Sequence, residues 1–182
     1  MKIKTQIGPY SKDRIVLCST DAHPDSQRKE PYYAGFFFPG ATWVGAVRNA
    51  AQDLGCRLVI LTTAHGMVDS LDLIGPYDLH IDADMRKVGR NWSETIPCLM
   101  GKNQCDLVVL YTGGCPREPY IELLKPVLHD NGISLIAFGK PNTFDSGRVV
   151  DVARLLMNGT HLEELRSILK SPDTLEFFPV ES

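Results

Sequence analysis

The sequence of 182 residues lacks the features that define several large classes of protein. No apolar run approaches the ~20 residues that a membrane-spanning helix needs, so no membrane partner is expected. The first residues, Met1–Lys4, lack the apolar core of a signal peptide. The cysteines are five in number and form no C-x-x-C pair, which disfavours a disulfide framework or a zinc ribbon. Together these absences predict a protein of the reducing cytoplasm.

The sequence also lacks the short motifs of familiar active sites. H-E-x-x-H and G-x-S-x-G are absent, and so are the G-x-G-x-x-G and Walker loops. We therefore expect neither a metal nor a cofactor. The net charge of −3 argues against a chain whose main task is to coat nucleic acid, although a local basic groove is compatible with it.

What is present is a regular alternation of strand-like and helix-like segments. Runs of β-branched and aliphatic residues predict strands at Arg14–Ser19, Leu58–Thr63, Leu107–Thr112 and Ser134–Phe138. Helical periodicity predicts helices at Gly40–Leu54, Asp84–Met100 (interrupted by Gly89 and Pro97), Pro119–His129, Asp145–Asn158 and His161–Leu169. This order indicates an α/β fold, with a four-stranded, mainly parallel sheet in a single three-layer domain. The domain would span residues 1–182, with its core at about 14–157 and a C-terminal helix and tail at 160–182.

The carboxyl ends of the predicted strands are the expected place for a ligand. Parallel strands end at the same edge of a sheet, and open α/β sheets bind their ligands there. The second strand should be followed by an irregular loop, because Gly66, Gly75 and Pro76 forbid a long helix. The segments that would meet at this edge are 19–25, 64–78, 113–118 and 139–148.

The loop after the second strand carries the candidate catalytic residues. His65 is suited to proton transfer near neutral pH, and Asp72 and Asp78 are candidate carboxylates. Each has a structural alternative, because a loop histidine is more often structural and aspartates stabilise turns. Tyr77 either lines the ligand or plugs the loop onto the core.

Two further segments are candidates for holding an anion. Gly113 and Gly114 directly follow a strand and form either an anion-binding nest or a tight turn. Ser146, Gly147 and Arg148 begin a helix, where N–H groups and a guanidinium bind a phosphate or carboxylate, or where they act only as an ordinary cap.

The region before the first long helix has several interpretations. The polar run Gln27–Glu30 is expected to be exposed and to act as a lid. Tyr32-Tyr33 and Phe36–Phe38 form an aromatic cluster that belongs to the core, to a protein interface or to a stacking wall for a planar base.

The order of these pieces resembles the core of the YaaA-type peroxide-stress proteins and of small uncharacterised domains related to them. The resemblance extends over roughly Arg14 to Met157. Its most specific part is the D-x-I-x-P-Y-x-L segment Asp72–Leu79, which follows a strand and the small-residue turn Ala64–Val68. The chain departs from that pattern at His65, in a longer loop at 23–33, and in lacking length for a helix-hairpin-helix insertion. Shorter matches are Cys18–Thr20, Gly113-Gly114 with Tyr120, and Gly147-Arg148.

The resemblance implies a fold like that of uracil-DNA glycosylase and a ligand related to nucleobases, nucleotides or nucleic acid. The ligand-binding candidates that it adds are Ser19, Gly66, Tyr77 and Tyr120. The first hypothesis is an enzyme that hydrolyses or exchanges an N-glycosidic bond of a nucleotide or nucleobase derivative. The alternative is a non-catalytic module that binds a nucleotide or nucleic acid in the same cleft. A third possibility is a partner-binding protein that forms a homo-oligomer through Phe36–Phe38.

Overall fold

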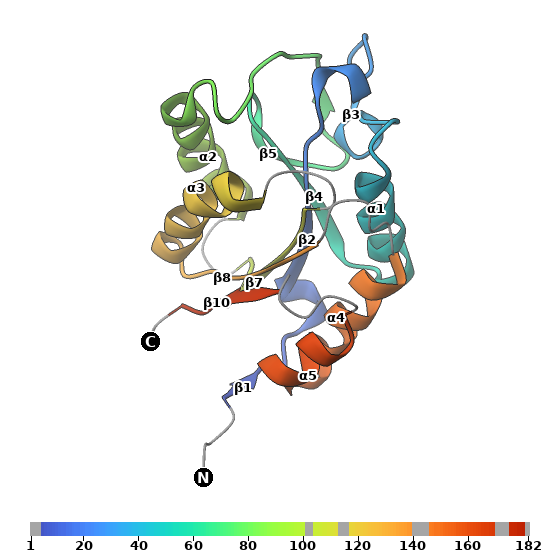
Figure 1. Ribbon diagram of the computed structural model, residues 1–182, viewed down its shortest axis with the longest axis vertical. Helices are drawn as coiled ribbons and strands as arrows, with labels where there is room; N and C mark the ends of the chain where they lie inside the picture. The colour runs from blue at the N-terminus through green and yellow to red at the C-terminus, as the bar shows by residue number, and fades with distance from the viewer. Residues whose placement is uncertain (1–4, 101–103, 113–116, 140–145, 170–174, 181–182) are drawn as a thin grey trace.

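A six-stranded sheet forms the centre of the protein, in the order β10-β8-β7-β2-β4-β5 (Figure 1). The computed structural model describes residues 5–100, 104–112, 117–139, 146–169 and 175–180. None of the helices in these ranges combines the length and the apolar composition that a membrane span requires.

The four strands predicted from the sequence are confirmed, and they run parallel to one another. They are β2 (Ile15–Thr20), β4 (Arg57–Thr62), β7 (Leu107–Tyr111) and β8 (Ser134–Phe138). Antiparallel strands extend the sheet at both edges, namely β5 (Gly66–Asp69) beside β4 and β10 (Glu176–Phe178) beside β8. Two short ribbons lie outside the sheet: β1 (Gln6–Ile7) with β9 (Thr160–His161), and β3 (Tyr32–Tyr33) with β6 (Leu73–Ile74).

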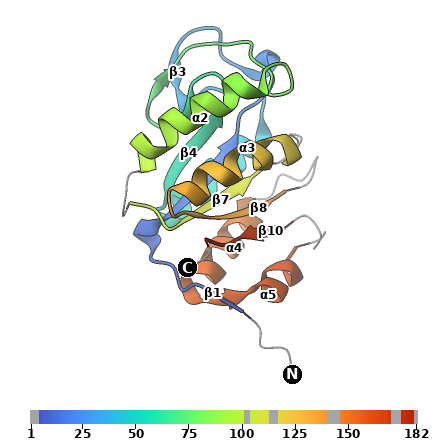
Figure 2. The same cartoon turned by 90° about the vertical axis from the view of Figure 1, so that its left-hand side faces the viewer.

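Helices cover both faces of the sheet and make three layers. Because successive strand residues point to opposite faces, Leu17 and Val109 pack on one side while Cys18 and Leu110 pack on the other. The first face is covered by α1 (Thr42–Leu54) and α4 (Ser146–Asn158), and the second by α2 (Met85–Met100) and α3 (Arg117–Asp130) (Figures 1 and 2). The remaining helix is α5 (Leu162–Ser167), and short 3-10 helices lie at Lys12–Arg14, Pro24–Ser26 and Ala34–Phe36.

The expected count of four strands is wrong, because the sheet has six. The two edge strands, β5 and β10, were not predicted because their sequence signals are weak. The segment 64–78 was expected to be an irregular loop, yet it contains β5 and β6. In β5 only Gly66 and Met67 are buried, and the strand forms because it pairs with β4, with Met67 opposite Leu61. The expected extended tail contains β10, in which Phe177 pairs with Ile136 of β8.

Helix α2 is continuous, although Gly89 and Pro97 were expected to interrupt it. Val88, Trp92 and Ile96 recur every four residues and are fully buried against the sheet. The burial of this stripe outweighs the cost of the glycine and of the helical hydrogen bond that Pro97 cannot donate.

Gly66 is required by the turn between β4 and β5. Its φ is +75°, and an added Cβ would lie 2.2 Å from Thr95 Oγ1 of α2. We expect Gly66→Ala to destabilise the protein by about 2–4 kcal/mol, because backbone strain and overpacking add. Urea unfolding would measure this. Gly75→Ala is the matched control, since nothing lies within 4 Å of its added Cβ. Equal stability of the two variants would contradict this role for Gly66.

Candidate functional site

The strand order creates a point of divergence between two neighbouring strands, β2 and β7. The chain leaves β2 for β4 through α1 on one face, whereas it leaves β7 for β8 through α3 on the other face. Open α/β sheets bind ligands in the crevice at such a point, outside the carboxyl ends of the strands. The residue that directly follows β2 at this point is Asp21.

Asp21 is a buried carboxylate that joins four segments of the chain. Only 3% of the residue is exposed. Its Oδ1 accepts a hydrogen bond from the hydroxyl of Tyr120 in α3. Its Oδ2 accepts one from the hydroxyl of Tyr77, in the loop after β6, and one from the backbone N–H of Thr63, at 3.0 Å, just after β4. The structure therefore brings two of the sequence-predicted binding residues, Tyr77 and Tyr120, onto one carboxylate.

The burial of this cluster changes its acid–base properties. Burial raises the pKa of the Asp21 carboxyl, although the hydrogen bonds from Tyr120, Tyr77 and Thr63 act in the opposite direction. Burial likewise raises the pKa of Tyr77, and the neighbouring Asp21 raises it further, so the Tyr77 hydroxyl keeps its proton at neutral pH. A carboxyl perturbed by burial at the ligand-binding edge of a sheet is a candidate functional group.

His65 lies in the β4–β5 turn and contacts this cluster through Tyr77. The two rings are perpendicular, with their centroids 5.2 Å apart. His65 Nε2 lies 2.9 Å from the carbonyl oxygen of Gly75. Because a carbonyl only accepts, Nε2 must carry the proton of the neutral ring, and Nδ1 is then the nitrogen that accepts. No residue in the described ranges bonds to that nitrogen.

Helix α2 holds the turn that carries His65. Asn91 Nδ2 donates to the carbonyl oxygens of Thr63 and Ala64, at 2.9 and 3.2 Å. Trp92 Nε1 donates to the carbonyl oxygen of Thr62 at 2.8 Å. These side chains bond the backbone at the end of β4, so α2 helps to hold the turn between β4 and β5 in position.

A cavity of about 620 Å³ opens beside Tyr77. The cavity is lined by the segments 24–29 and 76–78. Gln27 links the two segments, because its side-chain oxygen accepts a hydrogen bond from the backbone N–H of Tyr77 at 3.1 Å. The segment expected to act as a lid therefore lies against the loop after β6. The lining residues are Pro24, Asp25, Gln27, Arg28, Lys29, Pro76, Tyr77 and Asp78.

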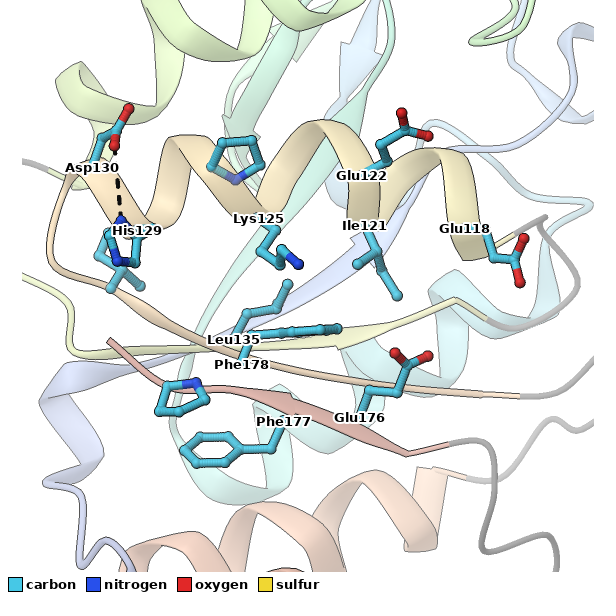
Figure 3. A pocket seen from close by; sticks show the side chains of 13 residues that line it. Glu118, Ile121, Glu122, Lys125, His129, Asp130, Leu135, Glu176, Phe177 and Phe178 are labelled. Atoms are coloured by element: carbon cyan, nitrogen blue, oxygen red, sulfur yellow. Dashed lines mark ion pairs between the residues drawn. The ribbon is translucent and has the colours of Figure 1, made fainter. Parts of the chain in front are cut away.

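A larger cavity, of about 780 Å³, lies elsewhere, between α3 and the edge strand β10. In Figure 3, Glu118, Glu122 and Glu176 lie toward the start of α3, and His129 and Asp130 lie at its other end. The Lys125 ammonium stands 5.0 Å from the centre of the Phe178 ring between them. The sequence did not predict this groove, because one of its walls is β10, which was not expected as a strand.

The two candidate aspartates lie on the surface. Asp72 is exposed in the turn before β6, where its Oδ2 accepts the backbone N–H of Asp69 at 3.1 Å. Asp78 is also exposed, 3.3 Å from His80 Nε2, and it lines the cavity beside Tyr77. Of the predicted carboxylates, Asp78 is therefore the one adjacent to a space that a ligand can enter.

The remaining predicted binding residues belong to other segments of the chain. Ser19 is buried within β2 and donates to the carbonyl oxygen of Thr20 at 3.0 Å. Gly147 and Arg148 lie in the first turn of α4, and a guanidinium nitrogen of Arg148 lies 3.9 Å from a carboxylate oxygen of Asp151. Gly113 and Gly114 lie outside the described residues, as does the side chain of Ser146.

Sequence reasoning missed Asp21 as a specific residue, although it placed the segment 19–25 at the carboxyl edge. One signal was available. Asp21 is a carboxylate that directly follows the polar end of the continuous strand run Ile15–Thr20. In the described part of the chain, no group of three or more His, Cys, Asp or Glu side chains is arranged to hold a metal ion.

Comparisons with known proteins leave the chain unassigned. No protein family matches it, and no curated protein does. Among solved structures, it is similar to the C-terminal domain of a hydrogenase from Pyrococcus furiosus, with 16% sequence identity and a TM-score of 0.39. That match covers 77% of this chain and 100% of the other. The site is therefore interpreted from its own geometry.

The raised pKa of Asp21 makes a prediction about stability. Between the ordinary aspartate pKa, about 3.9, and the raised value, the folded protein binds more protons than the unfolded chain. The stability of the parent should therefore fall as pH rises through this window and level off above it. Asp21→Asn lacks this decline, so its stability relative to the parent should increase with pH. Urea unfolding of both proteins from acidic to neutral pH would show this, and parallel curves would contradict it.

Proposed function

We propose that the protein binds a nucleotide or nucleobase derivative beside Tyr77 and hydrolyses or exchanges its N-glycosidic bond. The observation that carries the proposal is the buried Asp21 carboxylate, held by the hydroxyls of Tyr77 and Tyr120 at the point where β2 and β7 diverge. The resemblance of Asp72–Leu79 to YaaA-type cores supports a nucleobase as part of the ligand.

Cleavage of an N-glycosidic bond makes two demands on a site. Positive charge develops on the sugar as the bond to the base breaks, and nearby negative charge stabilises it. An attacking water must also lose a proton. In hydrolysis, water adds to the anomeric carbon, the base leaves with the bonding electrons and gains a proton, and the products are the free base and the sugar.

The residues around Tyr77 fit these demands. Asp21 is a positioning residue, because its oxygens hold the tyrosyl hydroxyls and its charge lies behind them. His65 presents Nδ1 as a proton acceptor, and its orientation is held by the carbonyl of Gly75. Asp78, at the rim of the cavity, is the carboxylate available to the sugar.

The cavity supplies groups that suit a nucleotide. Tyr77 offers an aromatic ring to a base. Arg28 and Lys29 supply positive charge for a phosphate, and the cavity lining also carries the carboxylates of Asp25 and Asp78. The start of α4, with Gly147 and Arg148, is the second proposed position for a phosphate.

Loss of the proton acceptor should lower turnover without unfolding the protein. We expect His65→Gln to reduce release of free base by about 10²–10⁴-fold, because glutamine can still donate to the carbonyl of Gly75 but cannot take up a proton. Chromatography of the base released from a panel of nucleotides would measure this. His129→Gln, on the exposed end of α3, is the matched control and should retain parental turnover. Saturable binding with no release of base from any nucleotide would instead identify a non-catalytic binding module.

The position of the phosphate is testable by thermal unfolding with matched pairs of nucleotide and nucleoside. A ligand at 100 times its Kd stabilises a protein by about 2.7 kcal/mol, so a phosphate contact should make the nucleotide the stronger stabiliser. We expect Arg28→Ala to remove most of that difference if the phosphate lies in the cavity. Arg148→Ala should remove it if the phosphate lies at the start of α4. Equal stabilisation by nucleotide and nucleoside in the parent would contradict both positions.

A further inference from the structure

In the described part of the chain, the large hydrophobic side chains that are exposed lie close together. Among the described residues, five large hydrophobic side chains are exposed, and all belong to the segments 32–36 and 71–73. Leu71 is 72% exposed and Leu73 is 67% exposed, and the three aromatic residues are exposed by 41–46%. Clusters of this kind, unlike scattered single residues, mark interaction surfaces. The five residues, which we call the ribbon patch, are Tyr32, Tyr33, Phe36, Leu71 and Leu73.

Backbone pairing holds the two segments of the ribbon patch together. Tyr33 in β3 lies opposite Leu73 in β6. The pairing continues beyond the strands, because the N–H of Ala34 donates to the carbonyl of Asp72 at 2.8 Å. The N–H of Gly35 likewise donates to the carbonyl of Ser70, at 2.9 Å. Figure 1 shows β3 at the opposite end of the molecule from β1.

Two arginines are fixed over the aromatic rings of the patch. The Arg28 guanidinium lies 4.2 Å from the centre of the Tyr32 ring, and its Nε donates to the carbonyl of Phe36 at 2.8 Å. The Arg48 guanidinium lies 4.4 Å from the centre of the Phe36 ring, and it donates to the carbonyl of Gly35 at 2.9 Å. Because these side chains are already ordered, they would lose little conformational entropy when a partner binds to them. Aromatic residues and arginine are also the types enriched in protein interfaces.

The charges around the patch favour a second copy of the chain as its occupant. Arg28, Lys29 and Arg48 are accompanied by the exposed carboxylates of Glu30 and Asp72. A two-fold interface places the same patch on both sides, so a rim that carries both signs can pair with itself. The phosphates of a nucleic-acid strand would be repelled by those carboxylates. The aliphatic tips of Leu71 and Leu73, in addition, offer no face for stacking bases.

We propose that two copies of this chain associate through the ribbon patch, with Leu71 and Leu73 in the apolar centre and the arginines and carboxylates in the rim. Strands of two residues each make a ribbon that is marginal in water, and a second copy would cover its exposed face. Arg28 belongs to the rim of the patch and also lines the cavity beside Tyr77. The partner copy therefore lies next to the entrance of the candidate site. The proposal is independent of the reaction proposed above.

Sedimentation velocity over a wide range of protein concentration tests this association. The parent is expected to change from monomer to dimer as concentration rises. Leu71→Glu and Leu73→Glu should each weaken the dimer by at least about tenfold, because each places a carboxylate in the apolar centre of the interface. Gln104→Glu adds the same charge at an exposed position away from the patch, and it should dimerise like the parent.

Thermal unfolding of each variant establishes that its fold is retained, and the high exposure of both leucines makes this the expected result. If Leu73→Glu proved unfolded, Leu71→Glu, which lies in a turn, would carry the test. A parent that sediments as a monomer at every concentration would overturn the proposal. So would a dimer that all three variants form equally well, since it would use another face, such as the groove between α3 and β10. A monomeric parent that binds a single-stranded oligonucleotide, with binding lost in Phe36→Ala, would reassign the patch to nucleic acid.

Discussion

The Asp21 carboxylate depends on donors that come from distant parts of the chain, and those parts depend on it in turn. A buried carboxylate is stable only when hydrogen bonds replace the water that it has lost. Tyr77, Tyr120 and the N–H of Thr63 provide these bonds, and they belong to the loop after β6, to α3 and to the end of β4. Each segment must therefore be in place for the charge to be tolerated. This requirement couples the carboxyl edge of the sheet to the fold as a whole, because displacement of one segment would remove a hydrogen bond from the buried carboxylate.

The same edge is stiffened from a second direction by α2. Asn91 and Trp92 bond the backbone at the end of β4, and Gly66 brings β5 close to Thr95. His65 is therefore held on a turn supported by a helix, with the carbonyl of Gly75 selecting which ring nitrogen carries the proton. The proposed role of His65 as a general base would use this orientation. The cavity beside Tyr77 and the ribbon patch meet at Arg28, so ligand binding and self-association would involve adjoining surfaces.

The local pattern of the sequence predicted the main elements of the fold. Continuous aliphatic runs identified β2, β4, β7 and β8, because strands covered on both faces are apolar throughout. The same reasoning failed for β5 and β10, whose formation depends on pairing with β4 and β8 rather than on an apolar run. It also failed for the interruption of α2, where the buried stripe of Val88, Trp92 and Ile96 outweighs local propensity.

For the site, the sequence by itself determined where the polar loops would gather, because the carboxyl ends of parallel strands must share an edge. Only the tertiary structure decided which side chains meet there. Tyr120 lies 99 positions from Asp21, and Tyr77 lies 56 positions from it, so no local periodicity links them. The aromatic cluster was divided in the same way, with Phe37 and Phe38 in the core and Phe36 on the surface. Periodicity reports the burial of an element along its own length, whereas a contact between distant residues depends on how the elements pack together.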